Sequence, residues 1–343
     1  MRYARFVGVD VHLRTSSVCV LDDQGRVEQR RTLTGGWSKL AEFVSTIEGP
    51  FSACFEASCG YGAVHDLLSK HAAHVVAAHA GSLRLIYRSK RKNDRVDAEK
   101  LAKLLYLDAV PAVHVPSAAV RAWRGLIEHR ARLVRRRTRC KNQIKALVRG
   151  LGIEAPEKLW TRAGQEWLSK LELGERADAL RRDVSVEELR ETRGRLRRVD
   201  AELDRIGADQ AGIALLQTIP GVGPRTAEAV LAYVDRPERF RSGRALGCYF
   251  GLVPCQDASA STNRMGHITR DGPASVRGLL AEAAWHGIRH SPTLRAFHAR
   301  VMRGEADRKK IALVATARHL LEVMLAMLRS GEVWREDASA EAA

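Results

Sequence analysis

The chain has 343 residues and a formal net charge of +17, from 57 Lys and Arg against 40 Asp and Glu residues. Hydrophobic residues make up 45% of it, which excludes a wholly disordered protein and supplies enough apolar material for packed cores. The positive charge predicts a polyanionic partner, above all nucleic acid. An anionic membrane surface is the competing partner, but it requires an amphipathic anchor or a lipid signal, and we identify neither.

The first part of the chain, residues 1–116, follows an α/β pattern. Three apolar runs predict a meander of strands, and later segments alternate between helical and strand periodicity. The expected strands are 6–11, 16–21, 27–33, 51–55 and 74–78, and the expected helices are 37–47, 61–71 and one that starts near residue 93.

The middle part, residues 117–208, is strongly basic and helical. Glu128 is the only acid between Ser117 and Gly150. A second charged helix is expected from about Val186 to Ile206, so this part predicts an antiparallel coiled coil or a helical hairpin. The residues expected to bind nucleic acid here are Arg135, Arg136, Arg137, Arg139 and Lys141.

The last part, residues 209–336, is predicted to be a small, mostly helical domain, followed by a disordered tail over 337–343. The expected helices cover 225–234, 274–289, 292–302 and 311–328. The apolar stretch 311–328 contains charged side chains, which indicates a core helix rather than a membrane span. The six cysteines lack a paired C-x-x-C spacing, which disfavours zinc and disulfide frameworks and favours a reducing, cytoplasmic location.

Four acids form a candidate metal site. Asp10 and Glu56 end two predicted strands, and Asp94 and Asp97 lie one helical turn apart. Each acid alone has an ordinary explanation as a strand-end or helix-start carboxylate. Together they supply the hard oxygen ligands that hold Mg²⁺ for phosphoryl transfer. The basic residues between them suit a phosphodiester substrate, and those expected to bind nucleic acid are Arg88, Lys90, Arg91 and Lys92.

Two Gly-rich or polar segments of the last part are further candidates. The run from Ile219 to Pro224 predicts the hairpin of a helix-hairpin-helix element, in which Gly221 and Gly223 let the backbone approach a phosphate. An ordinary interhelical turn explains the same run equally well. The polar loop 251–262 is followed by Arg264 and Arg270, and it could present a serine nucleophile or bind phosphate.

Several short motifs together resemble one protein family. They are G-V-D-V-H at 8–12, E-A-S-C-G-Y at 56–61, K-N-D-R-V-D-A at 92–98, I-P-G-V-G-P at 219–224, G-L-V-P at 251–254 and G-H-I-T-R-D-G at 266–272. In this order they resemble insertion-sequence transposases that pair a RuvC-like DEDD domain with a C-terminal serine-bearing transposase domain. These are bridge-RNA-guided recombinases, and pilin-gene invertases are their relatives.

The resemblance implies an RNase H-like (RuvC-like) domain, a coiled coil and a helical transposase domain. It implies that Asp10, Glu56, Asp94 and Asp97 bind Mg²⁺ or Mn²⁺, and that Ser259 is the nucleophile. The neighbours of Ser259 depart from the family pattern, so Ser261 is the reserve candidate, and Cys59 replaces the usual glycine. The acidic site and the serine would meet between subunits.

The implied partners are donor and target DNA, a structured guide RNA and further copies of the chain in a dimer or tetramer. The implied location is the cytoplasm of a prokaryote, in association with the nucleoid. Three alternatives stay open: a site-specific invertase without an RNA guide, a metal-dependent junction nuclease that uses water, and a non-catalytic nucleic-acid-binding protein. The sequence specifies neither the guide, the target site nor the size of the oligomer.

Overall fold

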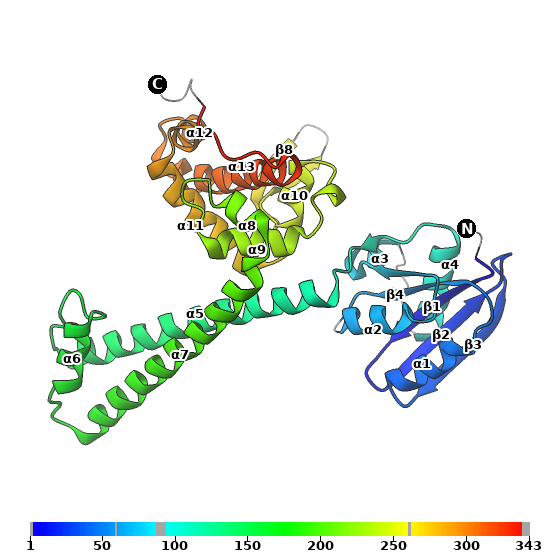
Figure 1. The fold of residues 1–343 in the computed structure, drawn as a ribbon, viewed down its shortest axis with the longest axis horizontal. Coiled ribbons are helices and arrows are strands. Elements are labelled where there is room, and N and C mark those ends of the chain that lie inside the picture. The colour runs from blue at the N-terminus through cyan, green and yellow to red at the C-terminus, as the bar shows by residue number, and fades with distance from the viewer. Residues whose placement is uncertain (1–2, 59, 87–93, 260–261, 338–343) are drawn as a thin grey trace. The chain divides into compact units, whose positions relative to one another are not determined.

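The computed structural model describes residues 3–58, 60–86, 94–259 and 262–337. The chain divides into two compact units, Met1–Arg121 and Ala122–Ala343 (Figure 1). The first unit is a mixed α/β domain, and the second is predominantly helical.

A six-stranded mixed sheet in the order β3-β2-β1-β4-β5-β6 forms the centre of the first unit. β1 pairs in parallel with β4 and β4 with β5, whereas the remaining pairs are antiparallel. This arrangement is consistent with the expected RNase H-like fold. The strands are β1 Arg5–Val11, β2 Thr15–Leu21, β3 Val27–Thr34, β4 Phe51–Glu56, β5 His74–Ala78 and β6 Ala112–Val113.

Helices flank this sheet. They are α1 Trp37–Ser45, α2 Tyr61–Leu68, α3 Ala80–Ile86 and α4 Asp94–Tyr106. Val7, Val9 and Phe55 pack with side chains of α1 and α2 in one core cluster. The other strand positions, such as Cys54, pack with α4 side chains in separate clusters. The alternation follows from the two-residue period of a strand, which sends successive side chains to opposite faces. The sequence did not predict α3 or the two-residue strand β6.

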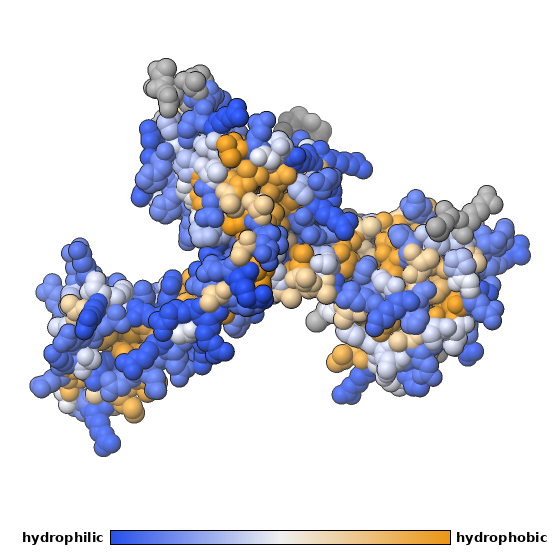
Figure 2. All heavy atoms as spheres, viewed as in Figure 1, coloured by the Kyte–Doolittle hydropathy of each residue, from blue (hydrophilic) through white to orange (hydrophobic). Residues whose placement is uncertain are grey.

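A long antiparallel helical hairpin forms the first part of the second unit, and its first helix begins at the end of the first unit (Figure 1). Its helices are α5 Ala118–Gly150 and α7 Arg176–Ala208, with the short α6 Arg162–Lys170 between them. Ion pairs of 2.6 Å between Arg130 and Asp200 and of 2.8 Å between Arg136 and Glu188 join α5 to α7. α7 begins ten residues before the predicted start, and coiled-coil packing stays a prediction. The visible surface of the hairpin is largely hydrophilic, with apolar patches near its free end (Figure 2).

The rest of the second unit is a helical domain around one large core. Its helices are α8 Ala211–Leu216, α9 Pro224–Val234, α10 Gly243–Tyr249, α11 Ala274–His290, α12 Pro292–Met302 and α13 Lys309–Ser330, with short 3-10 turns at Pro237–Arg239 and Ala306–Arg308. The segment Ala306–Ser330 is long and apolar enough to cross a membrane by length and composition alone. Leu320, Leu321 and Met324 are fully buried in the domain core, so the contacts of α13 are those of a core helix.

A β-hairpin interrupts this helical domain and corrects the prediction that strands are absent after Ser117. β7 Pro254–Ser259 pairs with β8 Thr262–Ile268 where the sequence predicted a polar loop. The described side chains of both strands are largely exposed, so the segment lacks the apolar alternation by which strands are recognised. Gly251, with a φ of 65°, lies so close to Asp271 that a Cβ would overlap its backbone, which brings the two ends of the hairpin together.

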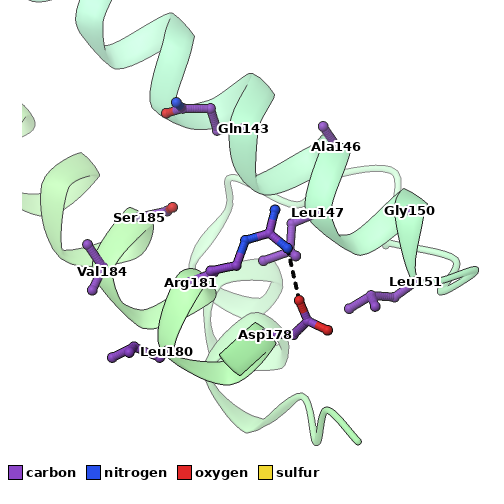
Figure 3. Close-up of a pocket in the computed structure, with 10 residues that line it drawn as sticks. All are labelled: Gln143, Ala146, Leu147, Gly150, Leu151, Asp178, Leu180, Arg181, Val184 and Ser185. Carbon is purple, nitrogen blue, oxygen red and sulfur yellow. Dashed lines mark hydrogen bonds and ion pairs between the residues drawn. The ribbon is translucent and has the colours of Figure 1, made fainter. Parts of the chain in front are cut away.

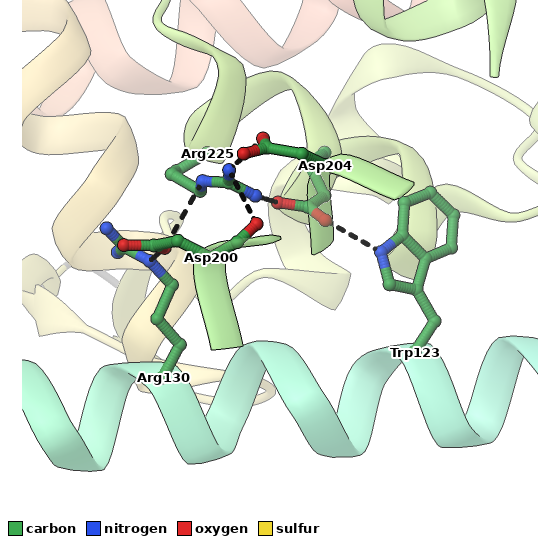
Figure 4. Close-up of polar contacts among 6 residues, drawn as sticks. Trp123, Arg130, Asp200, Asp204 and Arg225 are labelled. Carbon is green, nitrogen blue, oxygen red and sulfur yellow. Dashed lines mark hydrogen bonds and ion pairs between the residues drawn. The ribbon is translucent and has the colours of Figure 1, made fainter. Parts of the chain in front are cut away.

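A polar network fixes the base of the helical hairpin to the helical domain (Figure 4). Glu228 on α9 is 2% exposed and accepts hydrogen bonds from Trp123 Nε1 at 2.9 Å and from Arg225 at 2.8 Å. Arg225 also pairs with Asp200 and Asp204 of α7. Burial raises the pKa of the Glu228 carboxyl above its ordinary value, and these donors counteract that shift.

Candidate active site and nucleic-acid interface

Three of the four predicted acids line one cavity in the first unit. The cavity has a volume of about 300 Å³, and Asp10, Glu56 and Asp97 contribute to its wall. Asp10 lies near the end of β1 and Glu56 ends β4, whereas Asp97 lies in the first turn of α4. Residues from two neighbouring parallel strands and one helix therefore meet at one edge of the sheet.

The two-residue strand period and one glycine explain this convergence. Asp10 shares its strand face with Gly8, and Glu56 shares its face with Cys54, which packs with α4 residues. A Cβ on Gly8 would lie 2.0 Å from the Ala98 carbonyl oxygen, so the absent side chain permits α4 to lie directly on β1. Both strand carboxylates consequently face the side of the sheet that α4 covers.

Two nitrogen-bearing side chains contact the acids. Lys100 Nζ lies 2.9 Å from Asp97 Oδ1, and His12 Nε2 lies 3.5 Å from Asp10 Oδ2. The sequence analysis assigned no role to either residue, although both lie within two or three positions of an acid and line the same cavity. Lys100 compensates one of the three carboxylate charges. The described lining of the cavity thus combines three carboxylates with one lysine and one histidine.

The donor chemistry of the cavity fits a hard divalent cation. Carboxylate oxygens are the ligands that Mg²⁺ and Mn²⁺ prefer. Among the side chains that the structure describes, no three His, Cys, Asp or Glu groups form a cluster that could hold a metal ion. The backbone of Asp94 starts α4, but its side chain is outside the described part of the structure. Arg88, Lys90, Arg91 and Lys92 also lie outside the described residues.

Two family models match the chain. A DEDD transposase model of IS110 elements matches residues 7–153, and a model described as the transposase IS116/IS110/IS902 family matches residues 213–299. The chain belongs to the IS110/IS116 family of DEDD transposases. An IS110-family transposase cuts and rejoins DNA, so the protein is an enzyme of DNA recombination.

Curated relatives agree with this family. The chain is 29% identical to "Putative transposase y4pF/y4sB" of Sinorhizobium fredii over 77% of this chain and 69% of that protein. It is 27% identical to "Probable family 20 transposase" of Pseudomonas aeruginosa over 91% and 92% of the two chains. It is 24% identical to the transposase for insertion sequence element IS1111A of Coxiella burnetii over 98% and 92%.

The transposase carries its candidate serine on the β7–β8 hairpin. Ser259 is the last residue of β7 and pairs in register with Thr262. Its side chain and the whole of Ser261 lie outside the described part. Arg264 is exposed on β8, and Arg270 follows that strand with a φ of 61°.

Two predicted nucleic-acid motifs of the transposase meet in a second cleft. This cleft, of about 600 Å³ within the second unit, is lined by Arg135 and Arg137 of α5 and by Gly221 and Gly223 of the α8–α9 loop. Arg136 is instead paired with Glu188 across the hairpin. Of the other two basic candidates, Arg139 is exposed and Lys141 lies 5.2 Å above the Trp160 ring.

A third cavity of the transposase lies near the free end of the helical hairpin (Figure 3). It has a volume of about 800 Å³, and apolar side chains such as Leu147, Leu180 and Val184 line much of it. Its charged groups, Asp178 and Arg181, pair with each other at 2.9 Å. A cavity with one carboxylate, already neutralised, lacks the ligands for metal-assisted phosphoryl transfer, so the cavity at the sheet edge is the better catalytic candidate.

Proposed function

We propose that the transposase uses a divalent ion, Mg²⁺ or Mn²⁺, held by Asp10, Glu56, Asp94 and Asp97. The observation that supports this proposal is the lining of one cavity by three of these carboxylates. The ion would stabilise the charge that develops on the phosphoryl oxygens during strand cleavage. The four carboxylates would hold the ion, and Lys100, which lies 2.9 Å from Asp97, adds a positive charge at the same site.

Ser259 is the proposed nucleophile. Its Oγ forms a bond to phosphorus while the phosphorus–oxygen bond to the departing strand breaks. The serine hydroxyl loses its proton and the departing oxygen gains one. The covalent serine–phosphate linkage conserves the bond energy, so a second strand hydroxyl can displace the serine and rejoin the DNA. A serine is a weak nucleophile at neutral pH, and the acidic site is the proposed source of its activation.

The proposal assigns catalysis to residues 1–116, a basic helical connection to 117–208 and serine presentation to 209–336. The partners are donor and target DNA, a structured guide RNA and further copies of the chain. The net charge of +17 supports a large polyanionic partner. RNA that co-purifies with the protein should match DNA that flanks its gene, whereas a protein that recombines without RNA would be the unguided invertase.

A suicide substrate tests the serine chemistry. DNA with a nick next to the cleavage site should trap a covalent protein–DNA adduct in the presence of Mg²⁺, and peptide mapping should locate it on Ser259. Ser259→Ala should form no adduct, and Ser261→Ala should form it normally. Loss of the adduct in Ser261→Ala alone would transfer the role to Ser261. Hydrolysed ends without an adduct would identify a nuclease that uses water.

A further inference from the structure

The cleft between α5 and the helical domain combines a basic wall with a backbone wall. Arg135 and Arg137 come from the middle of α5, and the opposite side is formed by the α8–α9 loop and by the first turns of α11, including Ser275 and Gly278. Ile127, Val134 and Leu279 add an apolar part to the lining. All of these residues belong to the second unit.

The two arginines of this cleft differ from their neighbours in their charge partners. Among the described residues, Arg135 and Arg137 take part in no ion pair, whereas Arg130 pairs with Asp200 and Arg136 with Glu188. Two guanidinium groups that line one cleft repel each other unless an anion lies between or beside them. Their planar donor arrays match the oxygens of a phosphate.

The opposite wall has a rigid backbone and an open approach. Gly221 has a φ of 89°, and a Cβ there would lie 2.5 Å from Gly287 N, so the loop is packed tightly on α11. This contact explains Gly221 without a ligand. A Cβ on Gly223 would meet nothing within 4 Å, and no side chain caps the start of α9 at this residue. The backbone at Gly223 is thus accessible from the cleft.

One exposed acid in the lining of the cleft would repel a bound anion. Glu282 of α11 is exposed and lines the cleft, whereas Glu228, the other lining acid, is buried and bonded to Trp123 and Arg225. The unpaired charges that face the opening are therefore two arginines against one glutamate. The net charge of these three side chains is positive, and single substitutions can raise or lower it.

We propose that this cleft binds the sugar–phosphate backbone of a nucleic-acid strand. Arg135 and Arg137 pair with phosphate oxygens, the backbone near Gly223 approaches the same strand, and the apolar side chains accommodate the sugars. The inference rests on the proposed function only in taking nucleic acid as the ligand. Duplex DNA and structured RNA share this backbone chemistry.

Salt-dependent binding tests the cleft. The full-length protein is titrated with a labelled DNA duplex and, separately, with a labelled RNA hairpin at several salt concentrations. The double variant Arg135→Gln/Arg137→Gln should lower the slope of log K against log salt by about 1.8 on duplex DNA, from 0.9 per lost phosphate contact. The same fall on only one of the two probes identifies which nucleic acid occupies the cleft.

The matched control removes the same charge from the same helix. Arg132 and Arg139 are exposed, have no ion pair among the described residues and do not line the cleft, so Arg132→Gln/Arg139→Gln should change the slope much less. Glu282→Gln should strengthen binding. If the slope falls equally for both double variants, or falls for neither, the proposal that this cleft binds nucleic acid is wrong.

The outcomes also separate this inference from the proposed function. Circular dichroism melting of each variant shows whether the fold persists. If the protein forms the adduct at Ser259 but Arg135→Gln/Arg137→Gln leaves the salt slope unchanged, the binding role of the cleft is refuted and the serine chemistry is retained. If Arg135→Gln/Arg137→Gln lowers the salt slope as expected but the protein forms no adduct, the cleft is retained and the serine chemistry is refuted.

Discussion

Gly8 of β1 and Ala98 of α4 lie in direct backbone contact, since a Cβ on Gly8 would come within 2.0 Å of the Ala98 carbonyl oxygen. This backbone contact influences the candidate active site. It fixes the distance between the strand that carries Asp10 and the helix that carries Asp97. The glycine therefore controls the geometry of the cavity although it contributes no functional group to it.

The first prediction concerns this contact. Gly8→Ala should displace α4, lower the free energy of unfolding by about 1–3 kcal/mol as overpacking does, and weaken Mn²⁺ binding. Gly125→Ala is the control, because a Cβ there meets nothing within 4 Å in the interior of α5 and should stabilise by roughly 0.5–1 kcal/mol. Chemical denaturation and calorimetric Mn²⁺ titration measure both quantities. Unchanged metal affinity in Gly8→Ala would separate the glycine from the site.

The second prediction concerns the ligands. Asp10→Asn should abolish Mg²⁺-dependent strand cleavage and leave nucleic-acid binding nearly intact, because the amide lacks the charge that a divalent ion requires. Asp23→Asn, in the exposed turn between β2 and β3, should behave as the unaltered protein. A gel assay of cleavage beside a binding titration is sufficient. Undiminished cleavage by Asp10→Asn would refute the role of Asp10.

The third prediction uses two lysines of α4. Lys100 pairs with Asp97 in the cavity, whereas Lys103 pairs with Glu99 at 2.7 Å and does not line it. Lys100→Gln removes a positive charge from the cavity, so Mn²⁺ should bind more tightly, on the order of fivefold for about 1 kcal/mol of relieved repulsion. Lys103→Gln should leave the affinity unchanged. Equal effects of the two substitutions would contradict a metal site next to Asp97.

The fourth prediction concerns the buried carboxyl of Glu228. Trp123→Phe removes one hydrogen bond to this carboxyl and should lower the free energy of unfolding by about 1–3 kcal/mol at neutral pH. Because burial already raises the pKa of Glu228, the folded state binds a proton more readily than the unfolded chain. The ionised Glu228 carboxylate therefore destabilises the folded state. The stability lost in Trp123→Phe should accordingly become smaller as the pH falls toward the ordinary pKa of glutamate. Denaturation curves across pH measure this trend.

Trp160→Phe is the control for this measurement. Trp160 packs on the small core near the end of the helical hairpin, and its ring lies under Lys141 rather than against a buried acid. Its replacement should lower stability by an amount that does not vary with pH in the acidic range. A pH-independent loss in Trp123→Phe would mean that the indole contributes packing alone.

The sequence by itself determined the order of the strands and helices in the first unit, apart from α3 and β6, and the two long charged helices of the second. These elements have strong periodicity, as in the run around Val7 and Val9, and their residues follow the rules of local structure. It also predicted Asp10, Glu56, Asp94 and Asp97 as one group, from two strand ends and one helix start, and three of these acids line one cavity of the structure.

Only the tertiary structure decided which of these residues meet. The packing of Gly8 on α4 brings Asp97 next to the strand that carries Asp10, and it places Lys100, three positions after Asp97 on the same helix, in the same cavity. Packing of the helical hairpin divides three consecutive arginines, because Arg136 faces Glu188 of α7 while Arg135 and Arg137 line the cleft with Gly223. The β7–β8 hairpin escaped prediction because its strands bury little apolar surface. Side-chain partners that are distant in the chain depend on how whole elements pack, and local sequence does not encode that packing.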